Sequence, residues 1–167
     1  FSLSVVAAQG PKELFELLLN TQKKFRIDEI RLCLVDRFHE VERLLTESYQ
    51  NNFKGLSFID TETCDLLISD IPDYPVLGTR ILSKYDWLIG FEEDNEYQSA
   101  ALLPLKRGNE IIGIQLLLSK DPKRYNKSDG TTFLRKLAAM IAISIENCIN
   151  RQRTLEQGYQ DGLTNAY

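Results

Sequence analysis

The chain has few of the residues on which metal centres and disulfide scaffolds depend. Its 167 residues include three cysteines and one histidine, His39. A structural zinc site needs about four thiolate or imidazole ligands, usually in close pairs, whereas Cys33, Cys64 and Cys148 stand far apart. The sequence therefore predicts no metal site and no disulfide framework. Buried, reduced thiols are expected instead, which is typical of a cytoplasmic protein.

An excess of positive charge and long apolar runs are also missing. The 20 basic side chains are outnumbered by 24 acidic ones, so the formal net charge is −4. Nucleic-acid-binding domains usually carry a basic patch, so neither nucleic acid nor an anionic membrane is an expected partner. The longest apolar runs, 111–118 and 138–145, fall far short of the roughly 20 residues that cross a bilayer. A cytoplasmic domain without membrane contact is expected.

The composition that is present suits a single domain with its own core. The chain is 43% hydrophobic and 26% charged, and a domain of this length buries about 70% of its unfolded surface. Residues 1–10 are predicted to be a helical extension or linker. A helix is predicted over 11–24, because Pro11 suits a first helical position and leucines recur at helical spacing. Ile30 to Asp36 is apolar at nearly every position, which predicts a central strand.

A hairpin is the clearest local pattern. Two apolar runs, Ser99 to Leu105 and Ile111 to Leu118, flank a polar loop in which Gly108 can adopt a positive φ. Pro104 has no N–H to donate to a ladder, so it is expected at an edge or a bulge. The segment 38–49 is ambiguous between strand and helix.

A long helix is predicted from about Thr131 to Gln157, because no proline or glycine interrupts these residues. One line along it repeats in alternating steps of four and three, the pattern of a two-stranded coiled coil. The members of this predicted seam are Leu134, Ala138, Ile141, Ile145, Cys148, Gln152 and Leu155. The alternative is a single exposed helix end. A polar helix end lacks support in a monomer, so the sequence favours a homodimer.

These segments together resemble a GAF domain. The resemblance is carried by Ser99-Ala-Ala-Leu-Leu-Pro-Leu105, by Ile111-Ile-Gly113 and by Asp121-Pro-Lys-Arg-Tyr125 before the last helix. More narrowly, residues 12–150 are similar to a GAF-related class, long called a domain of unknown function, that precedes GGDEF domains in bacterial proteins. The resemblance implies an α+β fold over 11–150, with a central antiparallel sheet, helices packed on it and a long C-terminal signalling helix.

The last residues resemble the opening of a GGDEF domain. Asp161-Gly162-Leu163-Thr164 matches that domain's Asp-x-Leu-Thr. The resemblance implies a coiled-coil linker helix over 151–160 and a truncated GGDEF start over 161–167. The Gly-Gly-Asp-Glu-Phe loop and its metal-binding carboxylates are absent from these residues, so no catalytic residue, cofactor or enzyme activity is expected here. The implied role is a sensory and dimerisation module of a bacterial diguanylate cyclase, in cyclic di-GMP signalling.

The same resemblance implies a pocket for an unknown small molecule between one sheet face and the irregular middle of the chain. The candidate ligand-binding residues are Tyr85, Trp87, Phe91, Ser99 and Gln115. For the aromatic residues, plain core packing is the alternative. Gln115 is an amide within an apolar strand, where an unpaired polar group costs about 1–3 kcal/mol. Two other functions stay open: a thiol-dependent reductase of GAF type, which needs an exposed thiolate, and a ligand-free structural spacer.

Overall fold

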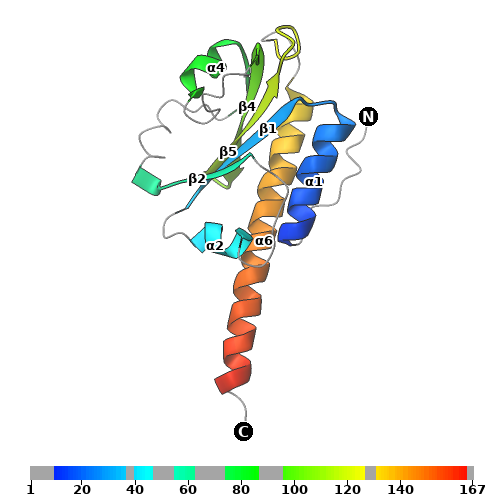
Figure 1. Ribbon diagram of the computed structural model, residues 1–167. Helices are drawn as coiled ribbons and strands as arrows, with labels where there is room; N and C mark the ends of the chain where they lie inside the picture. The colour runs from blue at the N-terminus through cyan, green and yellow to red at the C-terminus, as the bar shows by residue number, and fades with distance from the viewer. Residues whose placement is uncertain are drawn as a thin grey trace.

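The computed structural model describes residues 10–36, 40–46, 55–62, 74–86, 96–126 and 131–164. Within these residues the chain is α+β, with helices packed on a five-stranded sheet and a long helix that runs beyond it (Figure 1). The sheet order is β2-β1-β5-β4-β3. The strands are β1 (Glu29–Val35), β2 (Leu56–Ile59), β3 (Val76–Gly78), β4 (Ser99–Arg107) and β5 (Glu110–Ser119). The predicted fold class is confirmed, and the arrangement is consistent with a GAF-like fold.

The sheet is mixed, which corrects the expectation of an antiparallel sheet at one edge. β5 pairs antiparallel with both β1 and β4, and β3 pairs antiparallel with β4, but β1 and β2 are parallel. A parallel pair needs a crossover, usually through a helix. Here α2 (Glu40–Thr46) lies between the two strands in the sequence, so the described part of the segment 38–49 is helical, and its other residues lie outside the described ones.

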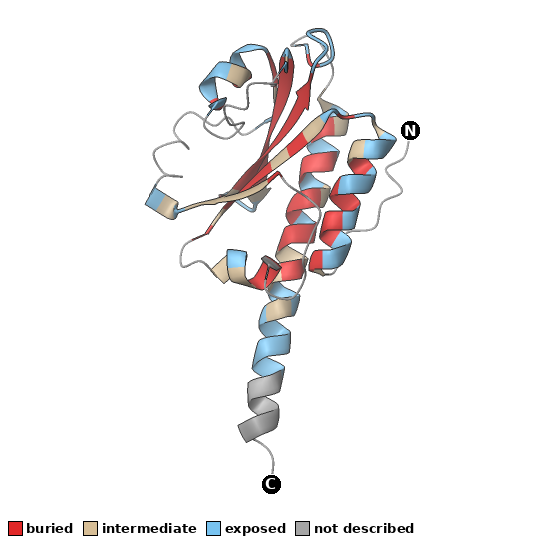
Figure 2. Cartoon of the chain, in the orientation of Figure 1, coloured by how far each residue is buried: buried red, intermediate tan, exposed pale blue. Residues whose placement is uncertain are grey.

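Two helices cover one face of the sheet. α1 (Pro11–Lys24) occupies the predicted range, and α6 (Thr132–Thr164) packs against both α1 and β4. Their inner sides join the helix-facing residues of β1, β4 and β5 in one apolar core, which includes Leu18, Leu32, Leu103 and Ile141. Figure 2 shows this buried stripe along both helices, with exposed residues on their outer sides.

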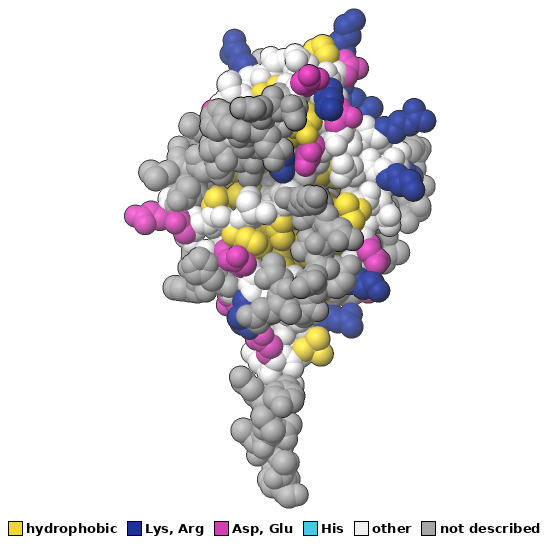
Figure 3. All heavy atoms as spheres, in the orientation of Figure 1, with side chains coloured by type: hydrophobic (Ala, Val, Ile, Leu, Met, Phe, Trp, Pro, Cys, Tyr) yellow, Lys and Arg dark blue, Asp and Glu magenta, His cyan; other side chains and the backbone are white. Residues whose placement is uncertain are grey.

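A smaller apolar cluster covers the opposite sheet face. α4 (Arg80–Lys84) lies over β4, and its Ile81 packs with Tyr85, Leu102 and Leu116. Burial on both faces explains why the central strands read as nearly continuous apolar runs. On the molecular face seen in Figure 3, acidic and basic side chains are interspersed around patches of hydrophobic ones, without a field of one sign.

The predicted hairpin is present and longer than expected. β4 and β5 pair from Ser99 opposite Ser119 to Arg107 opposite Glu110, which leaves a tight turn where Gly108 has a φ of 61°. Pro104 lies beyond the end of β3, whose pairing stops at Leu102, and a register shift follows between Leu105 and Lys106. The expectation of an edge or bulge position for this proline is confirmed.

The predicted coiled-coil seam needs correction over most of its length. Leu134, Ala138, Ile141, Ile145 and Cys148 are all at most 6% exposed and belong to the helix-side core of the same chain. A helix that packs on the core of its own protomer has an apolar stripe that repeats every 3.6 residues, and a coiled-coil helix has one that repeats every 3.5 residues. Over four turns these two patterns are nearly identical. Only Gln152, which is half-buried, and Leu155, which is 57% exposed, remain available to a partner helix.

Within the described part of the chain, no helical stretch combines the length and hydropathy needed to cross a membrane.

Candidate functional site

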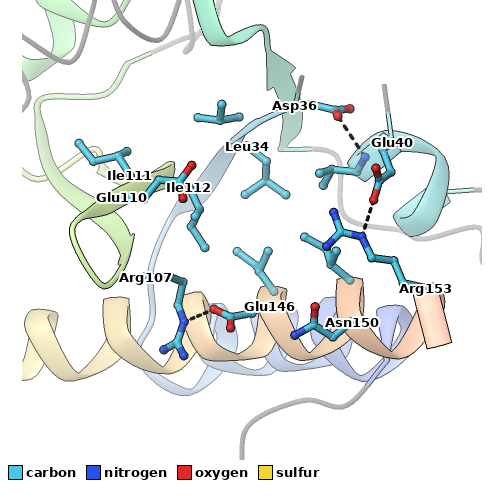
Figure 4. A pocket seen from close by; sticks show the side chains of 14 residues that line it. Leu34, Asp36, Glu40, Arg107, Glu110, Ile111, Ile112, Glu146, Asn150 and Arg153 are labelled. Carbon is cyan, nitrogen blue, oxygen red and sulfur yellow. Dashed lines mark hydrogen bonds and ion pairs between the residues drawn. The ribbon is translucent and has the colours of Figure 1, made fainter. Parts of the chain in front are cut away.

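A cavity of about 560 Å³ lies where α6 leaves the sheet. Its walls come from the end of β1, the start of α2, the β4–β5 turn and the middle of α6 (Figure 4). Much of the lining is apolar: Leu34, Val41, Ile112, Ile145 and Ile149 continue the helix-side core, and Ile111 belongs to the smaller cluster on the opposite sheet face. A concave site with an apolar interior and a few polar groups is the usual form of a small-molecule site.

Ion pairs fasten α6 on two sides of this cavity. Arg107, at the end of β4, pairs with Glu146 of α6, and Arg153 Nε of α6 lies 2.5 Å from Glu40 Oε1 of α2 (Figure 4). A third pair, Arg43 with Glu156, adds a second link between α2 and α6. All of these side chains are about 36–51% exposed, so each pair contributes at most about 1 kcal/mol. Links this weak can be broken at little cost in free energy.

Asp36 connects the end of β1 to the start of α2. Its carboxylate accepts hydrogen bonds from the backbone N–H groups of Val41, at 3.1 Å, and Glu42, at 3.0 Å. The first N–H groups of a helix have no partner within the helix, and a negative charge there is favourable. Asp36 is only 5% exposed, so this link is shielded from water and fixes one wall of the cavity relative to the sheet.

The charge of the lining limits which kind of molecule the cavity could accept. Four carboxylates, those of Asp36, Glu40, Glu110 and Glu146, face two guanidinium groups, those of Arg107 and Arg153. A formal excess of negative charge disfavours a polyanion here and favours a neutral or cationic ligand. Within the residues described, no three Asp, Glu, His or Cys side chains are placed to hold a metal ion.

Of the ligand-binding residues predicted from the sequence, the three that the structure describes, Tyr85, Ser99 and Gln115, do not lie at one site. Tyr85 is 4% exposed and packs in the cluster under α4. Ser99 lies in register on the opposite, helix-side face, where its hydroxyl donates to the Asp121 carbonyl at 2.6 Å and lies 3.4 Å from the Tyr125 N–H donor. These bonds anchor the loop after β5, which is a structural role. Trp87 and Phe91 lie outside the described residues.

Gln115 also lies inside the core rather than at a pocket. It stands between Leu32 of β1 and Leu103 of β4 and is fully buried. Neither its Oε1 nor its Nε2 has a hydrogen-bond partner. An unpaired buried amide costs about 1–3 kcal/mol, so Gln115 lowers the stability of the fold at this position.

The sequence interpretation missed the residues that do line the cavity. The sequence interpretation places Asp36 at the end of the predicted strand, and a residue four positions before Glu40 does not match the sequence signal of a helix cap. The partners of Arg107 and Arg153 are 39 and 113 residues away in the chain. No local pattern reveals pairs at such separations.

Two of the three cysteines are unsuited to nucleophilic chemistry. Cys33 and Cys148 are both fully buried. Burial, with a smaller effect of Glu13, raises the pKa of the Cys148 thiol to about 12, so this thiol stays protonated at neutral pH. Thiolate, not thiol, is the nucleophile. Cys64 lies outside the described residues.

Comparison with known families gives a match over part of the chain. Residues 72–150 are similar to a family described as a protein of unknown function, DUF484. The matched segment, a little under half of the chain, contains the hairpin and most of the α6 wall of the cavity but not Asp36, Glu40 or Arg153. No curated protein matches the sequence. The similarity is to an uncharacterised family and brings no activity with it.

Proposed function

We propose that this chain is the sensory and dimerisation module of a bacterial diguanylate cyclase, and that a small molecule in the cavity beside α6 sets its output. The path of α6 carries the proposal. This helix begins on the sheet, lines the cavity with residues 145–153 and continues without a break to Asp161–Thr164, the motif that resembles the start of a GGDEF domain.

Orientation is the variable that such a module controls. Joining two GTP molecules requires two GGDEF domains that face each other. The cavity lies along residues 145–153 of α6, and the helix continues to Thr164, about 15–30 Å further at 1.5 Å per residue. A small tilt at the cavity is therefore enlarged along this length, and a rotation of α6 about its own axis is carried to its end. A ligand shifts this equilibrium only by binding one arrangement more tightly than the other.

The second half of α6 is the surface that we assign to the partner copy. Beyond Cys148 the helix no longer packs on the sheet, and Leu155 is 57% exposed. A large apolar side chain on an otherwise polar helix gains by packing against its counterpart in a parallel helix pair. The dimer seam is thus proposed for residues 152 onward, not for the buried positions 134–148.

The alternatives are less well supported. A thiol-dependent reductase would have to rely on Cys64, because Cys33 and Cys148 are buried. A ligand-free spacer requires no cavity, whereas this fold has one of about 560 Å³ against the signalling helix.

The full-length gene product provides the test. One to seven alanines are inserted between Gln157 and Gly158, and the rate of cyclic di-GMP formation from GTP is measured for each. We expect activity to fall and recover with the helical repeat, with seven residues restoring the register. Light scattering on each variant is the control for dimer retention. An uninserted protein that makes no cyclic di-GMP, or activity indifferent to the insertions, contradicts the proposal.

A further inference from the structure

An under-satisfied cation lies on the sheet face away from α1 and α6. Leu32 and Leu34 of β1 point into the helix-side core, so Arg31 and Cys33 point to the other face. The Arg31 side chain is only 15% exposed. Its Nη1 lies 3.5 Å from Glu29 Oε1, and its Nε is buried without a hydrogen-bond partner. A guanidinium has five N–H donors, and among the described residues one carboxylate, that of Glu29, pairs with it.

A second unpaired polar group lies on the same face of the neighbouring strand β2. Ser57 of β2 is directly opposite Cys33, so its side chain shares the face of Arg31. The Ser57 hydroxyl is buried and has no hydrogen-bond partner. Gly55, whose carbonyl accepts the Leu32 N–H at 2.8 Å, places no side chain between them. A long arginine side chain can reach such a diagonal neighbour.

On the side of β5, the surroundings of Arg31 are apolar. The β5 residues opposite Arg31 and Cys33 are Leu116 and Ile114, both fully or almost fully buried. In such an environment an unpaired polar group is costly, and a charge-assisted hydrogen bond is stronger than in water.

Glu29 does not complete the coordination of Arg31. Its Oε2 accepts a hydrogen bond from the Tyr97 hydroxyl at 2.6 Å. Burial, and then this hydrogen bond to Glu29, raise the pKa of Tyr97, so the phenol remains a donor. The Glu29 carboxylate is thus shared between Tyr97 and Arg31, and it contacts only the Nη1 nitrogen of the guanidinium. The Nε–H of Arg31 is left without an acceptor among the described residues.

We infer that Arg31 and Ser57 form a binding site for the oxyanion of a small ligand, a carboxylate or a phosphate. The planar guanidinium fork matches both groups and can donate two parallel hydrogen bonds, while the serine hydroxyl donates a third. The site lies on the opposite sheet face from the cavity beside α6. It would bind an anion, whereas the charge of that cavity favours a neutral or cationic ligand. It does not depend on the proposed cyclase role.

The test measures binding directly on the purified chain. Sodium phosphate or sodium acetate is titrated at constant ionic strength against chloride, and the arginine Nε–H signals are followed by ¹H–¹⁵N NMR. We expect one Nε–H signal to shift saturably, and that signal to be absent from Arg31→Gln. Affinity should fall at least about tenfold in Arg31→Gln and about three- to tenfold in Ser57→Ala. Glu29→Gln should bind more tightly, because it removes the competing charge. Arg135→Gln, an exposed position on α6, is the matched control and should bind like the wild type.

A second variant tests whether a loss of binding could result from misfolding. Arg31→Met replaces the buried cation with an apolar chain, which is often neutral or stabilising when the cation lacks good partners. We expect it to melt no lower than the anion-free wild type and to show no thermal shift with either anion. A response to phosphate alone, to acetate alone or to both supports the site and distinguishes its ligand class. Absence of any wild-type response, or an equal response in the Arg31 variants, overturns the inference.

Discussion

At the scale of single residues, Cys148 couples the stability of the fold to alkaline pH. Its thiol pKa rises from 9.0 to about 12 on folding. Between these values the unfolded chain releases a proton that the native chain keeps, so the free energy of unfolding falls as pH rises. Below pH 9 this effect is absent.

We expect Cys148→Ala to lose this part of the pH dependence. Urea unfolding of both proteins between pH 8 and pH 11 should show the wild type losing about 1.4 kcal/mol more per pH unit above pH 9. The substitution also removes buried volume, which lowers stability equally at every pH. Burial also raises the pKa of Tyr97 and Tyr125, but both tyrosines are present in both proteins. If the free energy of unfolding of the two proteins fell equally with pH above pH 9, Cys148 would not be the source of this pH dependence.

Gly113 is required by the close approach of β5 to β1. A Cβ at this position would lie 2.6 Å from the Cys33 carbonyl oxygen and 2.9 Å from Leu34 Cδ2. We expect Gly113→Ala to destabilise the protein by about 1–3 kcal/mol in urea unfolding, because backbone must move. Gly158→Ala is the control. It has no atoms within 4 Å and lies in α6, so it should be neutral or stabilising. Equal effects of the two substitutions would argue against the close contact.

At the scale of elements, α6 divides into an internal and an external half. Ile145 is 1% exposed and Leu155 is 57% exposed, although the coiled-coil spacing treats them alike. We expect Ile145→Lys to lower the free energy of unfolding by about 4 kcal/mol or more, because it buries an unpaired charge. Leu155→Lys should leave the melting temperature of the protomer unchanged and weaken dimerisation in sedimentation equilibrium. If the Ile145→Lys protein were stable but failed to dimerise, the result would instead support the seam predicted from the sequence, which includes Ile145.

The short helix α2 depends on a single carboxylate at its start. We expect Asp36→Ala to cost about 1–2 kcal/mol, because it removes the acceptor for the N–H groups of Val41 and Glu42. Amide hydrogen exchange should rise in α2 more than in α1. Asp36→Asn keeps an acceptor oxygen and should restore part of the protection. Unchanged exchange in α2 would show that its ion pairs to α6 suffice to hold it.

At the scale of the whole molecule, local patterns predicted the elements but not how they combine. The ranges of α1, β1, the hairpin and α6 follow from periodicity and from the placement of proline and glycine. The parallel pairing of β1 with β2 does not, because it depends on the crossover through α2. Nor does the cavity, since its ion pairs join segments far apart in the sequence. In the sequence, Arg31 is only a charge within an apolar strand. Its few hydrogen-bond partners become evident only when the neighbouring strands β2 and β5 are placed beside β1.

The order of the strands also bears on how the protein can be divided. The segment 72–150 that is similar to an uncharacterised family contains β3, β4 and β5 but neither β1 nor α1. Expressed alone, it would present the whole length of β5 as an open edge and leave the inner side of α6 partly uncovered, a combination that promotes aggregation. A shortened version starting at residue 72 should therefore be insoluble, whereas one starting at residue 10 should refold reversibly. The segment that is similar to the family is thus smaller than the unit that we expect to fold on its own.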